Sequence, residues 1–434
     1  MNEFTLVGII GIVFLIVMLF TGMAVAYVMA LVGFIGFSYL TNLKAGLRLL
    51  STDVFSVFSS YGLTLIPLFV FMGYIAFYAG VSSSLYDVAY KFIGRVRGGL
   101  AMATVAACAA FGAVCGSATA TTATMGTIGL PEMKRYEYGP ELATGCVAAG
   151  GGLGSLMPPS VVLIVYGILT EQSIGDLFVA GILPAIFMTL LFMVAIRIYC
   201  AFKPDQGPKG EKFSIKEMIF SLKELWETLA VFLFVMGGLI AGLFTPTKSG
   251  AVGAFTILLI VLLRRKLSWE NFQNAVSGTL KISCMVIMLI AGATIFGHFL
   301  ALTRIPLELA HSVALLNWPS WAIMGLICFI YLVGGCFIDS LALIMLTIPI
   351  FFPIAVNLGY DPIWFGIIIV LVTHMGIITP PVGISVYITR GIAKDVPLVT
   401  IFKGSFPFLL ALIFGTAIMI AFPETVTYLP NMVH

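Results

Sequence analysis

Two proline pairs interrupt apolar stretches of this 434-residue chain. The first lies in GSLMPPS, residues 154–160, and the second in GIITPPV, residues 376–382. A proline inside a helix has no amide hydrogen to donate and clashes with the preceding turn. Each break should therefore leave free carbonyl oxygens on one side and free helix N-terminal amides on the other. Carbonyl oxygens suit a hard cation such as Na⁺, and the positive end of a helix suits a carboxylate.

Small polar residues interrupt two further apolar stretches, in CGSATATTATMG (115–126) and in CFIDSLAL (336–343). We single out Asp339, because a charge at membrane depth is costly and by default marks an ion or substrate path. The alternative is a carboxylate that caps a helix or pairs with Arg304. Four threonines of the first segment are either ligands or bonded back to their own helix: Thr119, Thr121, Thr122 and Thr124.

Two histidines, His298 and His374, also lie within apolar stretches. Each could carry a proton, and the alternative is a hydrogen-bonded packing role. We favour His374 of the two as a proton carrier, because it stands two residues before the second break. The seven cysteines show no CxxC or His-rich spacing. We interpret them as small buried hydrophobes and not as metal ligands.

The composition is that of a membrane protein. Hydrophobic residues make up 60% of the chain and charged residues 9%, against about 45–50% and 25% in soluble domains. The most polar interval, 203–224, is too short for a soluble domain. The formal charge of +3 is scattered along the chain, which gives no support for nucleic-acid binding. Glu3 stands where a signal peptide would carry basic residues, so we expect a first membrane helix.

Apolar stretches of about 20 residues are long enough to cross the hydrocarbon core. Residues 5–40 should form two spans broken near Thr21 and Gly22, and 41–56 should form an interfacial helix. The stretches 99–131 and 320–353 have a small or polar break midway and are expected to be re-entrant hairpins. Further spans are expected at 57–80, 141–170, 177–202, 225–244, 247–263, 279–302, 363–389 and 400–422.

The second half of the chain repeats the first at an offset of 222 residues, as in 353 minus 131. The offset also pairs expected spans, 5–20 with 227–242 and 57–80 with 279–302, and it aligns Ser117 with Asp339. Lysines and arginines of the short loops place an odd number of crossings between the hairpins, so the two halves are inverted. The matching pairs are Pro131 and Pro353, Tyr138 and Tyr360, Pro140 and Pro362, Gly154 and Gly376, Pro158 and Pro380, and Pro159 and Pro381.

Three segments resemble the large membrane subunit, the M or DctM-type subunit, of tripartite ATP-independent periplasmic (TRAP) transporters. They are GSATATTATMGTIGLPEMKRYEYGPELATG, GGLGSLMPPSVVLIVYG and THMGIITPPVGISVYI, and the likeness covers nearly the whole chain. The resemblance implies an all-α polytopic membrane protein with an inverted-repeat elevator-type transporter fold, which has two re-entrant hairpins and two broken helices. In that mechanism a transport domain slides against a scaffold and moves an organic acid inward on a Na⁺ gradient.

The resemblance also implies how the chain is divided. Scaffold helices and an arm should occupy 1–98 and, in the second repeat, 225–319. The transport domain should comprise 99–202, with the first hairpin and the broken helix 141–170, and 320–434, with the second hairpin and the broken helix 363–389. A cytoplasmic connector, 203–224, should join the two repeats.

Carried over by motif, the resemblance implies a Na⁺ site where each hairpin tip meets its broken helix, and a substrate carboxylate between the tips. Na⁺ is the only metal implied, and no organic cofactor is implied. The implied Na⁺ ligands are Gly116, Ser117, Gly154, Met157 and Pro158 in the first half and Asp339, Ser340, Gly376, Thr379 and Val382 in the second. The implied substrate contacts are Ser117, Ala118, Ser160, Pro381 and Gly383.

The resemblance implies two protein partners in a bacterial inner membrane. One is a small four-helix membrane subunit of the Q type, and the other is a soluble periplasmic substrate-binding protein of the P type. Because the chain begins directly at its first span, we expect it to be of the type in which the two membrane subunits are not fused. Substrates of the family include sialic acids and C4-dicarboxylates, and we favour sialic acid, with a C4-dicarboxylate next.

Three other functions are open. A stand-alone Na⁺/carboxylate symporter of the same superfamily would share the hairpins and breaks but would need no binding protein. A membrane-embedded enzyme would need paired carboxylates, a metal set or a nucleophile beside a base, and Asp339 with two isolated histidines forms none of these. A channel or a structural assembly subunit would not account for an inverted repeat with paired breaks.

Overall fold

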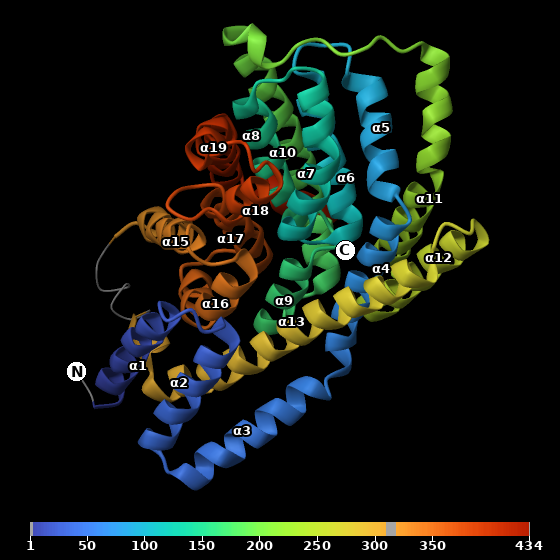
Figure 1. The fold of residues 1–434 in the computed structure, drawn as a ribbon. Helices are drawn as coiled ribbons and strands as arrows, with labels where there is room; N and C mark the ends of the chain where they lie inside the picture. The colour runs from blue at the N-terminus through green and yellow to red at the C-terminus, as the bar shows by residue number, and fades with distance from the viewer. Residues whose placement is uncertain (1–2, 310–317, 434) are drawn as a thin grey trace.

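The chain folds into helices throughout the part that the computed structural model describes, residues 3–309 and 318–433 (Figure 1). The only β-type pairing in these ranges is an isolated bridge between Arg97 and Lys209. Six of the described helices are long and apolar enough to cross a membrane, and the bent pair α8–α9 makes a seventh span. Shorter apolar helices of 10–17 residues accompany them. The predicted all-α polytopic fold is confirmed.

The first half contains both halves of the first hairpin and of the first broken helix. Its elements are α1 (Glu3–Leu19), α2 (Val25–Leu40), α3 (Leu43–Phe58), η1 (Tyr61–Thr64), α4 (Leu65–Tyr78), α5 (Val81–Ile93), α6 (Gly99–Cys115), α7 (Ala118–Arg135), α8 (Pro140–Leu156), α9 (Val161–Thr170), α10 (Ile174–Phe202) and η2 (Pro204–Gln206).

The second half contains the second hairpin, α15–α16, and the second broken helix, α17–α18. Its elements are α11 (Ile215–Ile240), α12 (Pro246–Leu263), α13 (Trp269–Thr303), α15 (Ser320–Gly335), α16 (Ser340–Asn357), α17 (Pro362–Ile377), α18 (Ile384–Ile392), α19 (Leu398–Ala421) and α20 (Glu424–Val433). Residues 310–317 of the predicted scaffold segment 225–319 lie outside the described ranges.

Helix bounds in the two halves follow the predicted offset of 222. The hairpin helix α7 covers 118–135 and α16 covers 340–357, which differ by 222 at both ends. The spans α2, 25–40, and α12, 246–263, also correspond within one residue. One difference is large: the single helix α13, 269–303, stands where the first half has α3, η1 and α4. The repeat is therefore present in the structure, with one helix broken in the first half only.

Two helix boundaries show how local sequence signals determine where a helix begins or ends. The predicted break near Thr21 is confirmed, because α1 ends at Leu19 and α2 begins at Val25. The helix that contains most of the predicted span 225–244 has its apolar part at Leu229–Ile240 but begins earlier than predicted, since α11 begins at Ile215. There Ser214 and Glu217 form a capping box, in which each side chain accepts a hydrogen bond from the other residue's amide. The final helix, α20, was not predicted.

The centre of the molecule is formed by α8 and α17, the first parts of the two broken helices. Every residue of α8 from Leu142 to Leu156 is buried, and so is every residue of α17 from Trp364 to Ile377. Glycines of α8 allow neighbouring helices to approach closely: a Cβ at Gly151 would lie 2.7 Å from the Cα of Thr122 in α7. The first hairpin thus packs directly against the first broken helix.

Candidate functional site

The tip of the first hairpin, residues 116–117, rests on the first break, residues 157–160. Gly116 has a left-handed backbone (φ +64°), and a Cβ there would lie 2.5 Å from the carbonyl oxygen of Pro159. Its own carbonyl accepts a hydrogen bond from the amide of Val161, 3.1 Å away. Ser117 then caps α7 by accepting from the amide of Ala120. Glycine is required at this tip for both conformation and space.

Oxygen atoms gather where the first tip meets α8. The missing side chain of Gly154 leaves room for the hydroxyl of Thr121 and the carbonyl of Ser117, which lies 2.7 Å from the position that a Cβ would take. The Thr121 hydroxyl is buried and has no hydrogen-bond partner among the described residues. Its neighbour Thr122 instead donates back to the carbonyl of Ala118. Thr121 therefore offers a buried free oxygen at the first tip, as a cation ligand would.

The tip of the second hairpin, residues 336–339, ends in an acidic helix cap. Asp339 accepts a hydrogen bond from the amide of Leu341 at 3.1 Å, so the capping role considered from the sequence is present. In the described part of the chain no ion pair joins Asp339 to Arg304 or to another cation. The hydroxyl of Ser340 is buried and unpartnered in the same part of the chain. A carboxylate and a free hydroxyl thus stand side by side at the start of α16.

The second break, residues 378–383, meets the second hairpin through backbone atoms. A Cβ at Gly376 would lie 2.6 Å from the Cα of Gly335, and the amide of Gly383 donates to the carbonyl of Cys336 at 3.1 Å. Gly383 has a left-handed backbone, with φ +64°. The hydroxyl of Thr379 donates to the carbonyl of Met375 in its own helix. The hydroxyl of Thr379 is therefore used within its own helix and is not turned toward the second tip by a hydrogen bond.

A cavity of about 290 Å³ lies between the two hairpin tips and the helices α4 and α13. The N-termini of α7 and α16 both border it, so the positive ends of two helix dipoles face one space. None of the described residues that line it is a lysine, an arginine or a histidine. Its polar lining residues are Tyr74, Ser117, Thr119, Thr124, Ser155, Asp339 and Ser340.

The predicted site residues fall into two groups. The cavity is lined by those of the two tips: Gly116, Ser117, Ala118, Asp339 and Ser340. Residues of the breaks stand behind the tips and do not line it. Ser160 is buried and donates its hydroxyl to the carbonyl of Ser155, which does line the cavity. The others of this group are Gly154, Met157 and Pro158 of the first half, and Gly376, Thr379, Pro381, Val382 and Gly383 of the second.

Sequence reasoning missed the wall opposite the tips. Val70, Tyr74 and Phe77 of α4 line the cavity, together with Ile282, Met285 and Val286 of α13. An apolar helix with two tyrosines, Tyr74 and Tyr78, has no signal that distinguishes a cavity wall from a lipid-facing surface. Only Gly73 gives a hint, because a Cβ there would lie 3.0 Å from the Cα of Cys115. This glycine brings α4 against the end of α6, beside the first tip.

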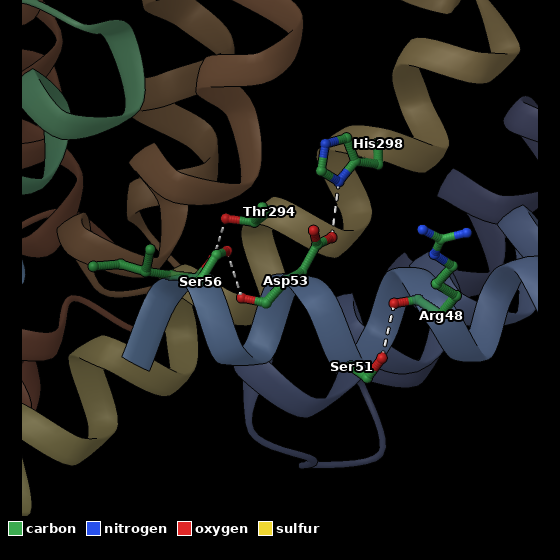
Figure 2. Close-up of polar contacts among 7 residues, drawn as sticks. Arg48, Ser51, Asp53, Ser56, Thr294 and His298 are labelled. Atoms are coloured by element: carbon green, nitrogen blue, oxygen red, sulfur yellow. Dashed lines mark hydrogen bonds and ion pairs between the residues drawn. The ribbon is translucent and has the colours of Figure 1, made fainter. Parts of the chain in front are cut away.

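The two histidines have structural partners. His374 is fully buried, lies 2.8 Å through Nε2 from the carbonyl of Ala149, and thereby joins α17 to α8. His298 of α13 lies 2.8 Å through Nδ1 from the carboxylate of Asp53 in α3 (Figure 2). Asp53 is 5% exposed. Neither histidine lines the cavity, and both connect helices that are distant in the sequence.

The oxygen chemistry of the tips fits a hard cation better than a transition metal. The described residues contain no group of three or more His, Cys, Asp or Glu side chains that could hold a metal ion. They do place hydroxyls, carbonyls and one carboxylate at the two tips, which are the donors that hard cations prefer.

Comparison with known proteins agrees with this architecture. Residues 12–425 match the family model described as "Tripartite ATP-independent periplasmic transporter, DctM component". The C4-dicarboxylate TRAP transporter large permease protein DctM of Pseudomonas aeruginosa is 34% identical over 88% of this chain and 90% of its own length. The sialic acid TRAP transporter large permease protein SiaM of Vibrio cholerae is 30% identical over 96% of each chain.

A solved structure supports the fold. The YdaH transporter of Alcanivorax borkumensis superimposes with a TM-score of 0.64 at 14% sequence identity, covering 88% of this chain and 90% of the transporter. At that identity the likeness concerns the fold alone. The relatives that share sequence are named as transporter permeases, so the chain is a transporter subunit and not an enzyme. The chain belongs to the DctM family, the large membrane components of tripartite ATP-independent periplasmic transporters.

Proposed function

We propose that this chain is the large membrane subunit of a Na⁺-coupled, binding-protein-dependent importer of an organic acid. The observation that carries the proposal is the cavity bordered by the N-termini of α7 and α16. Those helix ends attract a carboxylate. The buried free hydroxyls of Thr121 and Ser340 and the carboxylate of Asp339 stand at the same tips and suit Na⁺. Na⁺ bound there would offset the charge of Asp339 and of an anionic substrate, which couples the two ligands.

An elevator movement is the mechanism that we propose for this subunit. The first hairpin packs on α8 and the second on α17, and these two helices are joined by His374 and Ala149. On the cytoplasmic side, Lys134 at the end of α7 pairs with Asp395 after α18 at 2.7 Å. The cavity lies at the boundary between this body and the helices α4 and α13. These contacts favour movement of the hairpins and breaks as one transport domain, with α4 and α13 in the scaffold.

The proposed substrate is a sialic acid, with a C4-dicarboxylate next. Relatives named for both substrates match this chain over most of its length. The proposed partners are a small four-helix membrane subunit and a soluble periplasmic binding protein, and the proposed location is a bacterial inner membrane. Na⁺ is the coupling ion in this proposal.

Uptake into proteoliposomes tests the proposal. The chain is reconstituted with its small subunit, and uptake of radiolabelled sialic acid is measured with and without an inward Na⁺ gradient and with and without the binding protein. Uptake that needs both supports the tripartite mechanism. Na⁺-driven uptake without the binding protein favours a stand-alone symporter instead. Uptake of succinate but not of sialic acid, under the same two requirements, would assign the C4-dicarboxylate class.

A further inference from the structure

The cavity between the tips has two unlike walls. The side formed by the hairpins carries hydroxyls, a carboxylate and the N-termini of two helices. The side formed by α4 and α13 is apolar except at one residue, because the lining residues there are Val70, Gly73, Tyr74, Phe77, Ile282, Met285 and Val286. Among the described residues of that wall, Tyr74 is therefore the only one whose side chain can donate a hydrogen bond.

The position of Tyr74 is set by glycines on both sides. Gly73 allows α4 to touch the backbone of Cys115 beside the first tip, which brings the next residue to the cavity. The phenol end of Tyr74 lies over Gly278 of α13: a Cβ there would be 2.5 Å from Cζ and 2.9 Å from the hydroxyl oxygen. Tyr74 is half-buried, and no described residue hydrogen-bonds its hydroxyl. The contact with α13 thus positions this hydroxyl, and among the described residues it has no hydrogen-bond partner.

We propose that Tyr74 is a specificity-determining residue whose hydroxyl binds the end of the substrate that is remote from the carboxylate. This inference rests on the proposed function, in which the carboxylate lies at the opposite wall. A single hydroxyl on an apolar wall matches a substrate whose far end carries one uncharged polar group, such as a hydroxyl. A second carboxylate there would meet apolar side chains and no cation, which is unfavourable for a charge. The cavity therefore selects a hydroxylated monocarboxylate over a dicarboxylate as substrate.

Equilibrium binding to the purified complex of this chain and its small subunit, in NaCl, tests the role of Tyr74 without the binding protein. The probes are 4-hydroxybutyrate and butyrate, which differ only in the distal hydroxyl, and succinate, which carries a second carboxylate. Wild-type protein should bind 4-hydroxybutyrate about 3- to 10-fold more tightly than butyrate, the gain typical of one hydrogen bond. Succinate should bind more weakly than 4-hydroxybutyrate.

Two variants distinguish the effect of the hydroxyl from an effect on the fold. Tyr74→Phe keeps the ring and should bring the ratio of the two dissociation constants to about 1. Gly278→Ala keeps the hydroxyl but displaces the phenol, and it should reduce the same ratio. The matched controls are Tyr78→Phe, at a half-buried tyrosine of the same helix that does not line the cavity, and Gly297→Ala, at a glycine of α13 with open space around it. Both controls should keep the wild-type ratio.

The outcomes distinguish this inference from the proposed function. If both acids bind only with Na⁺ and the ratio is the same in wild type and Tyr74→Phe, Tyr74 does not select the substrate while the proposed function stands. If succinate binds more tightly than 4-hydroxybutyrate to the wild type, the substrate class is overturned. If no carboxylate binds in a Na⁺-dependent way, the proposed function fails, and the role of Tyr74 fails with it.

Discussion

The two junctions between hairpin and broken helix are built alike but are exposed and charged differently. In each, glycine backbones of the hairpin and the broken helix touch, and one backbone hydrogen bond of 3.1 Å joins tip to break. In the first junction Pro158, Pro159 and Ser160 are all buried, whereas Pro380 and Pro381 of the second are exposed. The helix caps differ as well: Ser117 is neutral where Asp339 is acidic.

This difference indicates a division of labour between the halves. The first junction is enclosed by its neighbours, with the ring of Pro158 against α10 near Gly181. The second junction carries the only acidic side chain among the described residues that line the cavity, and its break reaches the surface. We therefore expect the second half to contribute more to ion coupling and the first half more to the rigidity of the site.

The largest expected effect on uptake comes from removing the charge at the tip of the second hairpin. Asp339→Asn keeps a helix cap and removes only the charge, and it should lower Na⁺-driven uptake by about 10- to 100-fold, the loss of one interaction with a charged group. Asp339→Ala should lower uptake at least as much. Ser117→Ala, at the matching neutral cap, should lower it less than about 10-fold. Initial uptake rates in proteoliposomes, normalised to inserted protein, measure both. Wild-type uptake by the Asp339 variants would remove that residue from the site.

The packing of the first tip can be tested by adding one methyl group. Gly116→Ala forces a left-handed alanine and also meets the carbonyl of Pro159, and we expect a loss of about 2 kcal/mol or more in the free energy of unfolding. Gly22→Ala is the control, because Gly22 has φ +83° with nothing within 4 Å, and it should cost about 1 kcal/mol. Thermal unfolding of the purified complex compares them. Equal losses would mean that the tip does not depend on its contact with the break.

The two proline pairs offer a direct comparison of the breaks. Pro158→Ala and Pro381→Ala should each let helix extend into the break and weaken the Na⁺ dependence of uptake. Because Pro158 is buried and Pro381 is exposed, only Pro158→Ala should also lower stability, by about 1 kcal/mol. The Na⁺ concentration that gives half-maximal uptake, together with thermal unfolding, measures the two effects. If both variants keep the wild-type Na⁺ response, the breaks serve packing alone.

The smallest expected effect concerns the helix that is broken in the first half and continuous in the second. Asp53 of α3 binds His298 of α13 at 2.8 Å, which ties the separate helix to the continuous one (Figure 2). His298→Ala leaves the buried carboxylate without this partner and should cost about 1 kcal/mol, because His298 is half exposed and water can replace it. Ser51→Ala, on the exposed side of α3, is the control. Equal melting temperatures for the two variants would show that the tie is not stabilising.

Much of the site was predictable because prolines and glycines determine local backbone geometry. The doubled prolines and the offset of 222 located both breaks, and the cap residues Ser117 and Asp339 located both tips. The cavity wall formed by Tyr74 was not predictable, since a position in an apolar helix does not reveal which helix faces it. The pair of Asp53 and His298 is separated by 245 residues. No periodicity in the sequence brings such a pair together.

The central claim is that the two tips form one carboxylate site that requires Na⁺. Its most direct test is equilibrium binding of radiolabelled sialic acid to the purified complex of this chain and its small subunit, in NaCl and in KCl at equal ionic strength. We predict binding in NaCl, with affinity rising with Na⁺ concentration, and none in KCl. Equal affinity in the two salts would contradict the claim.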